Sequence, residues 1–383
     1  MIKDILKKYH VSLLLLTTML TLVGCQSKSK NVDFVIRTPQ EKLLTRLDTL
    51  RYHGVMYGHQ DDPFYGLSWS WEQGRSDTKD LLDDYPAVMG FDLGGIELDS
   101  PCNLDSVPFD WMRKEIISHY QRGGIITISW HPRNPRTEGT AWDVSDTTVV
   151  RNILPGGEQH ELFVSWMQKV GNFLKTLKLQ DGRSVPIILR PWHEYNGSWF
   201  WWGEKLCTPE QFKQLWCMFQ DYINEQLPTN IVWSFSPNLQ GNWTEQAFTQ
   251  RYPGNDRVDL LGCDAYQWGS EKDFISGLSA DLAFLNDFAQ KNDLLFAMTE
   301  CGKQNSTTPD WWSRVFLPLL QDYPVCYFLP WRNWHAEHFG ASKDAPTADD
   351  FRQLYENHQF QLLQDIVPAG IMTGRDSSEI IWL

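Results

Sequence analysis

Two glutamates, Glu194 and Glu300, stand just after apolar, strand-like runs of the sequence at residues 186–189 and 294–298. Two carboxyl groups that flank one bond can act as a general acid and as a nucleophile or base, which is the pair that glycoside hydrolysis requires. Parallel strands of one barrel place the residues that follow them at the same end. We therefore expect the two side chains to face each other across one cleft.

The residues near each glutamate predict different protonation states. The sequence neighbours of Glu194 include the aromatic residues Trp192, Tyr195 and Trp199. Removing a carboxyl group from water favours its protonated form, so Glu194 is the expected proton donor. Arg332 follows the next strand-like run and is the expected cationic neighbour that keeps Glu300 ionised. The alternative is a pair of rim glutamates that only form stabilising ion pairs.

Eight short apolar runs recur along the chain, and segments with helical periodicity separate them. The runs cover residues 54–58, 87–91, 125–130, 186–189, 231–235, 260–265, 294–298 and 325–329, and the helical segments include 111–120, 161–177, 210–223, 282–291 and 311–320. Alternating strands and helices indicate parallel units, and strands that are apolar throughout indicate burial on both faces. Eight such units predict an α/β fold with one closed (β/α)8 TIM barrel. A doubly wound open sheet is the alternative, but the Gly-rich phosphate loops typical of such folds do not occur in the sequence.

Tryptophan is the outlier of the composition, with 19 among 383 residues. Indole rings suit a cleft for sugars, because the C–H faces of sugar rings pack on them. Nine tryptophans follow predicted strands, namely Trp69, Trp71, Trp142, Trp199, Trp201, Trp202, Trp268, Trp331 and Trp334, whereas Trp166, Trp216, Trp233 and Trp311 are expected in the core. The net charge of −14 argues against nucleic acid as a partner, because phosphate binding needs clustered Lys and Arg.

The segment around Glu194 carries a family resemblance. Residues 190–202 read RPWHEYNGSWFWW, and Thr299 precedes Glu300. This pattern resembles glycoside hydrolase family 26, with similarity over about residues 40–365. The resemblance implies a retaining β-mannanase with a (β/α)8 barrel, in which Glu194 is the acid/base and Glu300 the nucleophile of a double displacement. We expect no cofactor and no metal.

The same resemblance implies contacts to the substrate. His193 would orient Glu194 and touch the sugar, and Tyr266 would hydrogen-bond Glu300. The other implied sugar contacts are His131, Trp142, Trp199, Trp331 and Arg332. The expected partner is β-mannan or a manno-oligosaccharide, bound by a monomeric protein.

The N-terminus has the pattern of an export signal. Lys3, Lys7 and Lys8 precede an apolar stretch at residues 11–23, which is too short to span a bilayer. Residues 22–25 read Leu-Val-Gly-Cys and resemble a bacterial lipobox, in which Cys25 is acylated. We expect a signal peptide at residues 1–24, a tether at 25–39 and a catalytic domain at 40–383, held by its lipid at the outer membrane and facing the periplasm. A buried N-terminal helix is the alternative.

Substrate and cleavage pattern stay open at this point. A β-1,3-xylanase or a mixed-linkage β-glucanase of the same family is the alternative to a mannanase, and a catalytically inactive glycan-binding lipoprotein is another. The polar segment 94–110 follows a predicted strand and would, as a wall at one end of the cleft, favour release of mannobiose from chain ends over internal cleavage. We also expect few disulfides, and a solvated turn at Asp61 and Asp62.

Overall fold

The computed structural model describes residues 37–367 of the protein. The expected signal peptide, the lipidation at Cys25 and nearly all of the tether lie outside these residues and stay predictions. Within the part of the chain that the structure describes, no helix is both long enough and apolar enough to cross a membrane.

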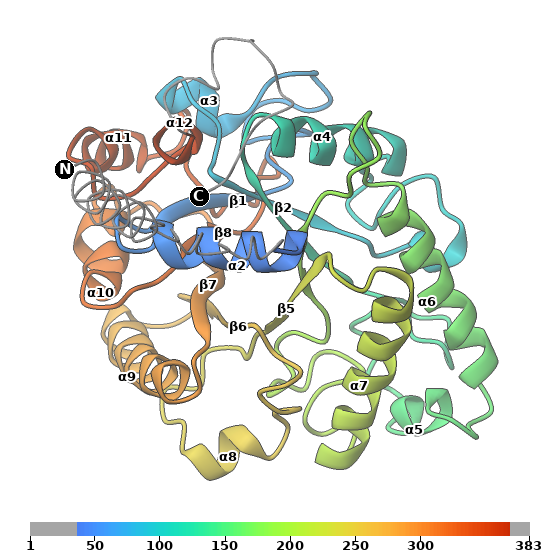
Figure 1. Cartoon of the computed structure of the whole chain (residues 1–383). Coiled ribbons are helices and arrows are strands. Elements are labelled where there is room, and N and C mark those ends of the chain that lie inside the picture. Colours follow the sequence, from blue (N-terminus) through green and yellow to red (C-terminus); the bar gives the residue numbers. More distant parts are fainter. Residues whose placement is uncertain (1–36, 368–383) are drawn as a thin grey trace, which may run out of the picture. The chain divides into compact units, whose positions relative to one another are not determined.

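Eight parallel strands close into one barrel, in which each strand pairs with the next and β8 pairs with β1 (Figure 1). The strands are β1 (Met56–Gln60), β2 (Val88–Asp92), β3 (Ile125–Ser129), β4 (Ile187–Arg190), β5 (Ile231–Phe235), β6 (Leu260–Tyr266), β7 (Leu295–Gly302) and β8 (Tyr327–Pro330). Each of them overlaps its predicted run, so the (β/α)8 TIM barrel is confirmed. Every strand residue except Tyr266 is buried, because side chains face either the barrel interior or the surrounding helices.

Most helices encircle the strands (Figure 1). They are α2 (Pro39–Leu50), α3 (Asp77–Leu82), α4 (Phe109–Gln121), α5 (Val149–Ile153), α6 (His160–Lys175), α7 (Pro209–Gln226), α8 (Glu245–Thr249), α9 (Glu271–Lys291), α10 (Leu317–Leu320), α11 (Ala348–Glu356) and α12 (Leu363–Ile366), with a 3-10 turn η1 (Ile96–Leu98) and a π-helix η2 (Trp312–Phe316). The first turn of α7 shows why helices begin where they do. Thr208 accepts from the backbone N–H of Gln211, whose side chain accepts in return, and Pro209 occupies the first helical position.

Helix α2 closes the amino-terminal end of the barrel. Its Leu43 and Leu47 share one apolar cluster with strand residues such as Val88, Ile125 and Val232. This packing fills the amino-terminal end of the barrel with apolar side chains. Polar chemistry is therefore left to the opposite end, where the strands finish.

The turn after β1 differs from the expectation. Asp61 and Asp62 are fully buried rather than solvated. The Tyr65 hydroxyl donates to Asp61 at 2.7 Å, and His59 Nδ1 lies 2.6 Å from Asp62. The expected solvated turn is wrong because the turn packs against the barrel, where each carboxylate finds a partner.

The described cysteines are all unpaired. Cys102, Cys207, Cys217, Cys263, Cys301 and Cys326 carry free thiols, and four of them are buried. This agrees with the expectation of few disulfides. Buried thiols here pack as small apolar side chains.

Candidate active site

A cleft of about 590 Å³ opens where the strands end. All nine site residues that the sequence predicts within the described chain line it, namely His131, Trp142, His193, Glu194, Trp199, Tyr266, Glu300, Trp331 and Arg332. They come from the ends of β3, β4, β6, β7 and β8 and from the loops that follow. The barrel therefore brings together residues that are up to two hundred positions apart in the sequence.

A strained turn after β4 holds Glu194 in the cleft. Trp192 and Glu194 have φ of 52° and 53°, in the left-handed region that non-glycine residues avoid. The backbone N–H of Glu194 donates to the carbonyl of Ser236 after β5, at 2.7 Å. Such strain persists only where surrounding contacts enforce it, and it clusters at functional sites.

The Glu194 side chain is in an environment that favours its neutral form. Burial, followed by the charge of Glu300, raises the pKa of Glu194 to about 8. Trp199 Nε1 donates to Glu194 Oε2 at 2.6 Å. The predicted direction of the shift is confirmed, but Trp192 and Tyr195 do not line the cleft and are packed in the core.

Glu300 lies inside β7, at a β-bulge. The pairing register between β6 and β7 shifts before Asp264, which faces Glu300, and this leaves Thr299 as an extra residue. Adjacent side chains of a regular strand point to opposite faces, whereas a bulge re-aims them. Thr299 Oγ1 donates to Asp264 at 2.6 Å, and Glu300 accepts from Arg190. The bulge thus lets two consecutive side chains reach the barrel interior.

The expected pairing of Arg332 with Glu300 is wrong. Arg332 Nε lies 3.1 Å from Asp105 Oδ1, and its Nη2 lies 3.9 Å from Glu337. The cation that contacts Glu300 is Arg190, the last residue of β4, whose side chain is buried inside the barrel. Arg332 follows β8 at the rim of the barrel, where Asp105 from the 94–110 loop is its nearer partner.

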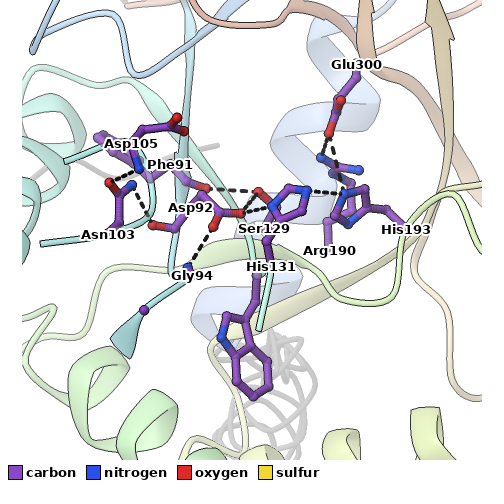
Figure 2. Close-up of polar contacts among 12 residues, drawn as sticks. Phe91, Asp92, Gly94, Asn103, Asp105, Ser129, His131, Arg190, His193 and Glu300 are labelled. Atoms are coloured by element: carbon purple, nitrogen blue, oxygen red, sulfur yellow. Dashed lines mark hydrogen bonds and ion pairs between the residues drawn. The ribbon is translucent and has the colours of Figure 1, made fainter. Parts of the chain in front are cut away.

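Arg190 holds two acidic side chains at once. Its Nη1 lies 2.8 Å from Asp264. Its Nη2 contacts Glu300 (Figure 2). One oxygen from each of Glu194, Asp264 and Glu300 lies within 4.8 Å of the others, as in a metal site. Arg190 supplies the positive charge that a metal ion would supply there. The acidic group is therefore suited to an internal arginine, and the absence of a metal stays a prediction.

Tyr266 and the two histidines complete the centre of the cleft. The Tyr266 hydroxyl donates to Glu300 Oε2 at 2.6 Å, so the expected hydrogen bond is present. The His193 ring does not turn toward Glu194; its Nε2 lies 3.0 Å from Nε2 of His131. Trp199, rather than His193, is the hydrogen-bond partner of Glu194.

Fewer tryptophans line the cleft than the sequence suggests. Four of the nine expected there do so, namely Trp142, Trp199, Trp268 and Trp331. The other five, Trp69, Trp71, Trp201, Trp202 and Trp334, pack against neighbouring residues instead. Trp202, for example, donates its indole N–H to the backbone carbonyl of His193 at 2.9 Å. It therefore supports the loop after β4. The four tryptophans expected in the core are buried, as predicted.

Sequence reasoning missed several residues of the site. The cleft is also lined by Leu104, Asp105, Phe200, Asn238 and Phe339, and three buried charges, Asp92, Arg190 and Asp264, stand at or near strand ends beside it. A signal for the buried charges exists, because Asp92 and Arg190 directly follow apolar runs and Asp264 lies near the end of one. A charged residue in that position is rarely buried without a partner.

The described geometry agrees with comparisons to known proteins. A family model described as glycosyl hydrolase family 26 matches residues 36–358. A mannan endo-1,4-β-mannosidase of Bifidobacterium adolescentis is 29% identical over 335 residues, which are 80% of this chain but only 32% of that relative's length. One of Bacillus subtilis is 28% identical over 66% of this chain and 67% of its own. The solved structure of a GH26 β-mannanase from Bacteroides ovatus is similar with a TM-score of 0.83 and 39% identity, over 86% of this chain and 96% of that one.

Proposed function

Because the chain belongs to glycosyl hydrolase family 26, we propose that it hydrolyses β-1,4-linked mannan or manno-oligosaccharides with retention of configuration. The names of the relatives from Bifidobacterium, Bacillus and Bacteroides support the choice of mannan. A cleft lined by several indole rings suits an uncharged polysaccharide. The proposed roles are general acid and base for Glu194 and nucleophile for Glu300.

The separation of the two carboxyl groups carries the proposal. One oxygen of Glu194 and one of Glu300 lie within 4.8 Å of each other. Retaining glycosidases hold their carboxyl groups about 5 to 5.5 Å apart, whereas inverting enzymes leave about 6.5 to 9.5 Å for a water molecule. The short separation therefore supports direct attack by a carboxylate.

The two glutamates are suited to successive steps of a double displacement. In the first step, a Glu300 oxygen forms a bond to the anomeric carbon while Glu194 gives its proton to the departing glycosidic oxygen. In the second step, Glu194 takes a proton from water, the water oxygen bonds to the anomeric carbon, and the Glu300 carboxylate leaves. The raised pKa of Glu194 supports the first step, because the residue holds its proton at neutral pH. Arg190 and Tyr266 both donate to Glu300 and orient it.

A comparison of substrates tests the proposal. We expect the purified protein to release reducing sugar from β-1,4-mannan and not from β-1,3-xylan or lichenan, because the sites of its named relatives act on mannan. The Glu300→Ala protein, prepared in the same way, controls for contaminating activity. Faster hydrolysis of xylan or lichenan would reassign the substrate, and inactivity on all three would favour the glycan-binding alternative.

One further contact supports action at chain ends. Leu104 and Asp105 of the 94–110 loop line the cleft, and Asp105 is ion-paired with Arg332 after β8. The pair joins the loops that follow β2 and β8, the two neighbours of β1, at the side of the cleft where Arg332 lies. We propose that this bridge closes one end of the groove, so that the enzyme releases mannobiose rather than cutting internally.

Digestion of mannohexaose labelled at its reducing end tests the closed groove. We expect one disaccharide at early times, and a ladder of products after Asp105→Ala, which removes the bridge. Asp110→Ala is the matched control, because Asp110 is an exposed carboxylate of the same segment that pairs only with Arg113 at the surface. A ladder from the unmodified protein would show an open groove and internal cleavage.

A further inference from the structure

Asp92, the last residue of β2, is a fully buried carboxylate that the proposed reaction does not use directly. Its Oδ2 lies 2.7 Å from His131 Nδ1 and accepts from the Ser129 hydroxyl at 2.6 Å. Its Oδ1 accepts from the backbone N–H of Gly94 at 2.7 Å (Figure 2). Three short hydrogen bonds thus fix both oxygens. A carboxylate held in this way fixes the orientation of the imidazole beside it.

The other nitrogen of His131 faces a second imidazole. His131 Nε2 and His193 Nε2 lie 3.0 Å apart, so one hydrogen must stand between two nitrogens. Burial, then the charges of Arg190 and His131, lower the pKa of His193 well below its usual range, so His193 is neutral. The Asp92 carboxylate on the far side of the His131 ring favours the arrangement in which His131 carries this hydrogen and His193 accepts it. His193 Nε2 in turn lies 4.0 Å from Glu300 Oε1.

In this arrangement His131 is a donor at both nitrogens. Burial by itself would lower the pKa of His131, but the charge of Asp92 and its hydrogen bond outweigh burial and raise this pKa. The titratable and charged groups that face His131 are Asp92 from β2, Asp105 from the 94–110 loop, Arg190, His193 and Glu194 from the end of β4, and Glu300 from β7. Among them, Asp92 is the carboxylate that bonds to the His131 ring.

We propose that Asp92 is a positioning residue that keeps His131 as a doubly protonated imidazolium. The second N–H group of His131 then points to His193, which lies beside Glu300, and the positive charge of the imidazolium stands near the two catalytic carboxylates. A buried carboxylate bonded to a histidine stabilises the imidazolium and fixes the direction of its remaining N–H. The catalytic consequence of this inference rests on the proposed function, but the protonation of His131 does not.

The side chain and the backbone of Asp92 have separable roles. The Asp92 carbonyl accepts from Asn103 Nδ2 at 3.1 Å, and Asn103 Oδ1 accepts from the backbone N–H of Asp105 (Figure 2). The same oxygen accepts from the backbone N–H of Val107. The backbone thus anchors the loop that carries Asp105. Asp92→Asn keeps this carbonyl and nearly the same volume, and it replaces the charge and one acceptor oxygen of the side chain with a neutral NH2 group. The variant therefore separates protonation of His131 from anchoring of the loop.

Nitrogen-15 NMR of labelled histidine measures the protonation of His131, with signals assigned by their loss in His131→Gln. At pH 7 we expect both ring nitrogens of His131 to be protonated in the unmodified protein and only one in Asp92→Asn. Ser129→Ala is the matched control, because it removes one bond to the same carboxylate but leaves its charge. His131 should stay doubly protonated in Ser129→Ala. A neutral His131 in the unmodified protein, or an unchanged one in Asp92→Asn, would overturn the proposal.

The pH dependence of kcat/KM gives the catalytic readout. At pH 8 we expect Asp92→Asn to be about 10- to 100-fold less active, as for other carboxylates that orient a functional histidine. Acidification restores the proton on His131, so the deficit should shrink as the pH falls to 5. A deficit that is the same at every pH would mean a merely structural role. If the Glu300→Ala protein keeps its activity, the proposed function fails, but the NMR result still decides the state of His131.

Discussion

Glu300→Ala is expected to reduce turnover of manno-oligosaccharides by about 10⁴-fold or more, because removal of the nucleophile removes the covalent route itself. The structure places Glu300 at a bulge in β7 with Arg190 and Tyr266 as donors, and no other carboxylate combines that position with access to the cleft from β7. The measurement is the initial rate of mannohexaose cleavage with a sensitive assay for reducing sugar.

Two further variants make the Glu300 result interpretable. Glu300→Gln can turn its one oxygen toward Arg190 and donate from its NH2 group to the Tyr266 hydroxyl oxygen, so it should be as inactive as the alanine variant while folding normally. Glu225→Ala removes an exposed glutamate near the end of α7 and should leave the rate unchanged. If Glu300→Ala keeps more than a few per cent of the rate of the unmodified protein, Glu300 is not the nucleophile.

Glu194→Ala is expected to lose activity in proportion to how poor the leaving group is. On mannohexaose the rate should fall by about 10²- to 10⁴-fold, since general acid catalysis contributes this much. On an aryl mannobioside with a dinitrophenolate leaving group, which needs no proton, the first step should be nearly unaffected. The second step lacks its base, so a burst of phenolate followed by a slow phase is the expected time course. Equal losses on both substrates would exclude Glu194 as the acid/base.

The raised pKa of Glu194 predicts how kcat/KM depends on pH. The first step needs protonated Glu194, and burial together with the charge of Glu300 raises its pKa to about 8. The value of kcat/KM on mannohexaose should therefore stay level through neutral pH and decline above about pH 8. In Glu194→Ala this alkaline decline should be absent from the residual activity on the activated substrate.

The barrel and its two glutamates could be predicted because both depend on local pattern. A strand buried on two faces must be apolar along its length, so eight such runs separated by helices already indicate eight parallel units. The residues that follow each run then lie at one end of the barrel. Nothing else is needed to place Glu194 opposite Glu300, and the cleft contains both.

The partners of those glutamates could not be predicted, because they depend on the direction in which each side chain points. Because Arg332 follows the strand after Glu300, the sequence indicated Arg332 as the cation beside Glu300. The order of residues does not show that Arg332 lies at the rim beside Asp105. Arg190 reaches across the barrel interior to β6 and β7, a contact between strands that are far apart in the sequence. The bulge at Thr299 follows from pairing with β6, and no single-residue signal marks it.

The sequence also could not predict which aromatic residues line the cleft. Trp199 and Trp202 are three positions apart in one motif, yet Trp199 lines the cleft and Trp202 is fully buried under His193. Composition and spacing indicate that tryptophans gather near the site. They do not divide those that face a ligand from those that support the loops, because this division depends on tertiary packing.

Because β1 pairs with β8, the barrel cannot close until almost the whole chain has been synthesised. Met56 pairs with Tyr327, so β1 keeps an open edge during synthesis until β8 has left the ribosome. Contacts between such distant segments are slow to form, and unpaired strand edges attract other chains meanwhile. The distance between Glu194 and Glu300 is set only when the ring closes. A nascent chain that stops before β8 would carry both glutamates without the closed ring that holds them together.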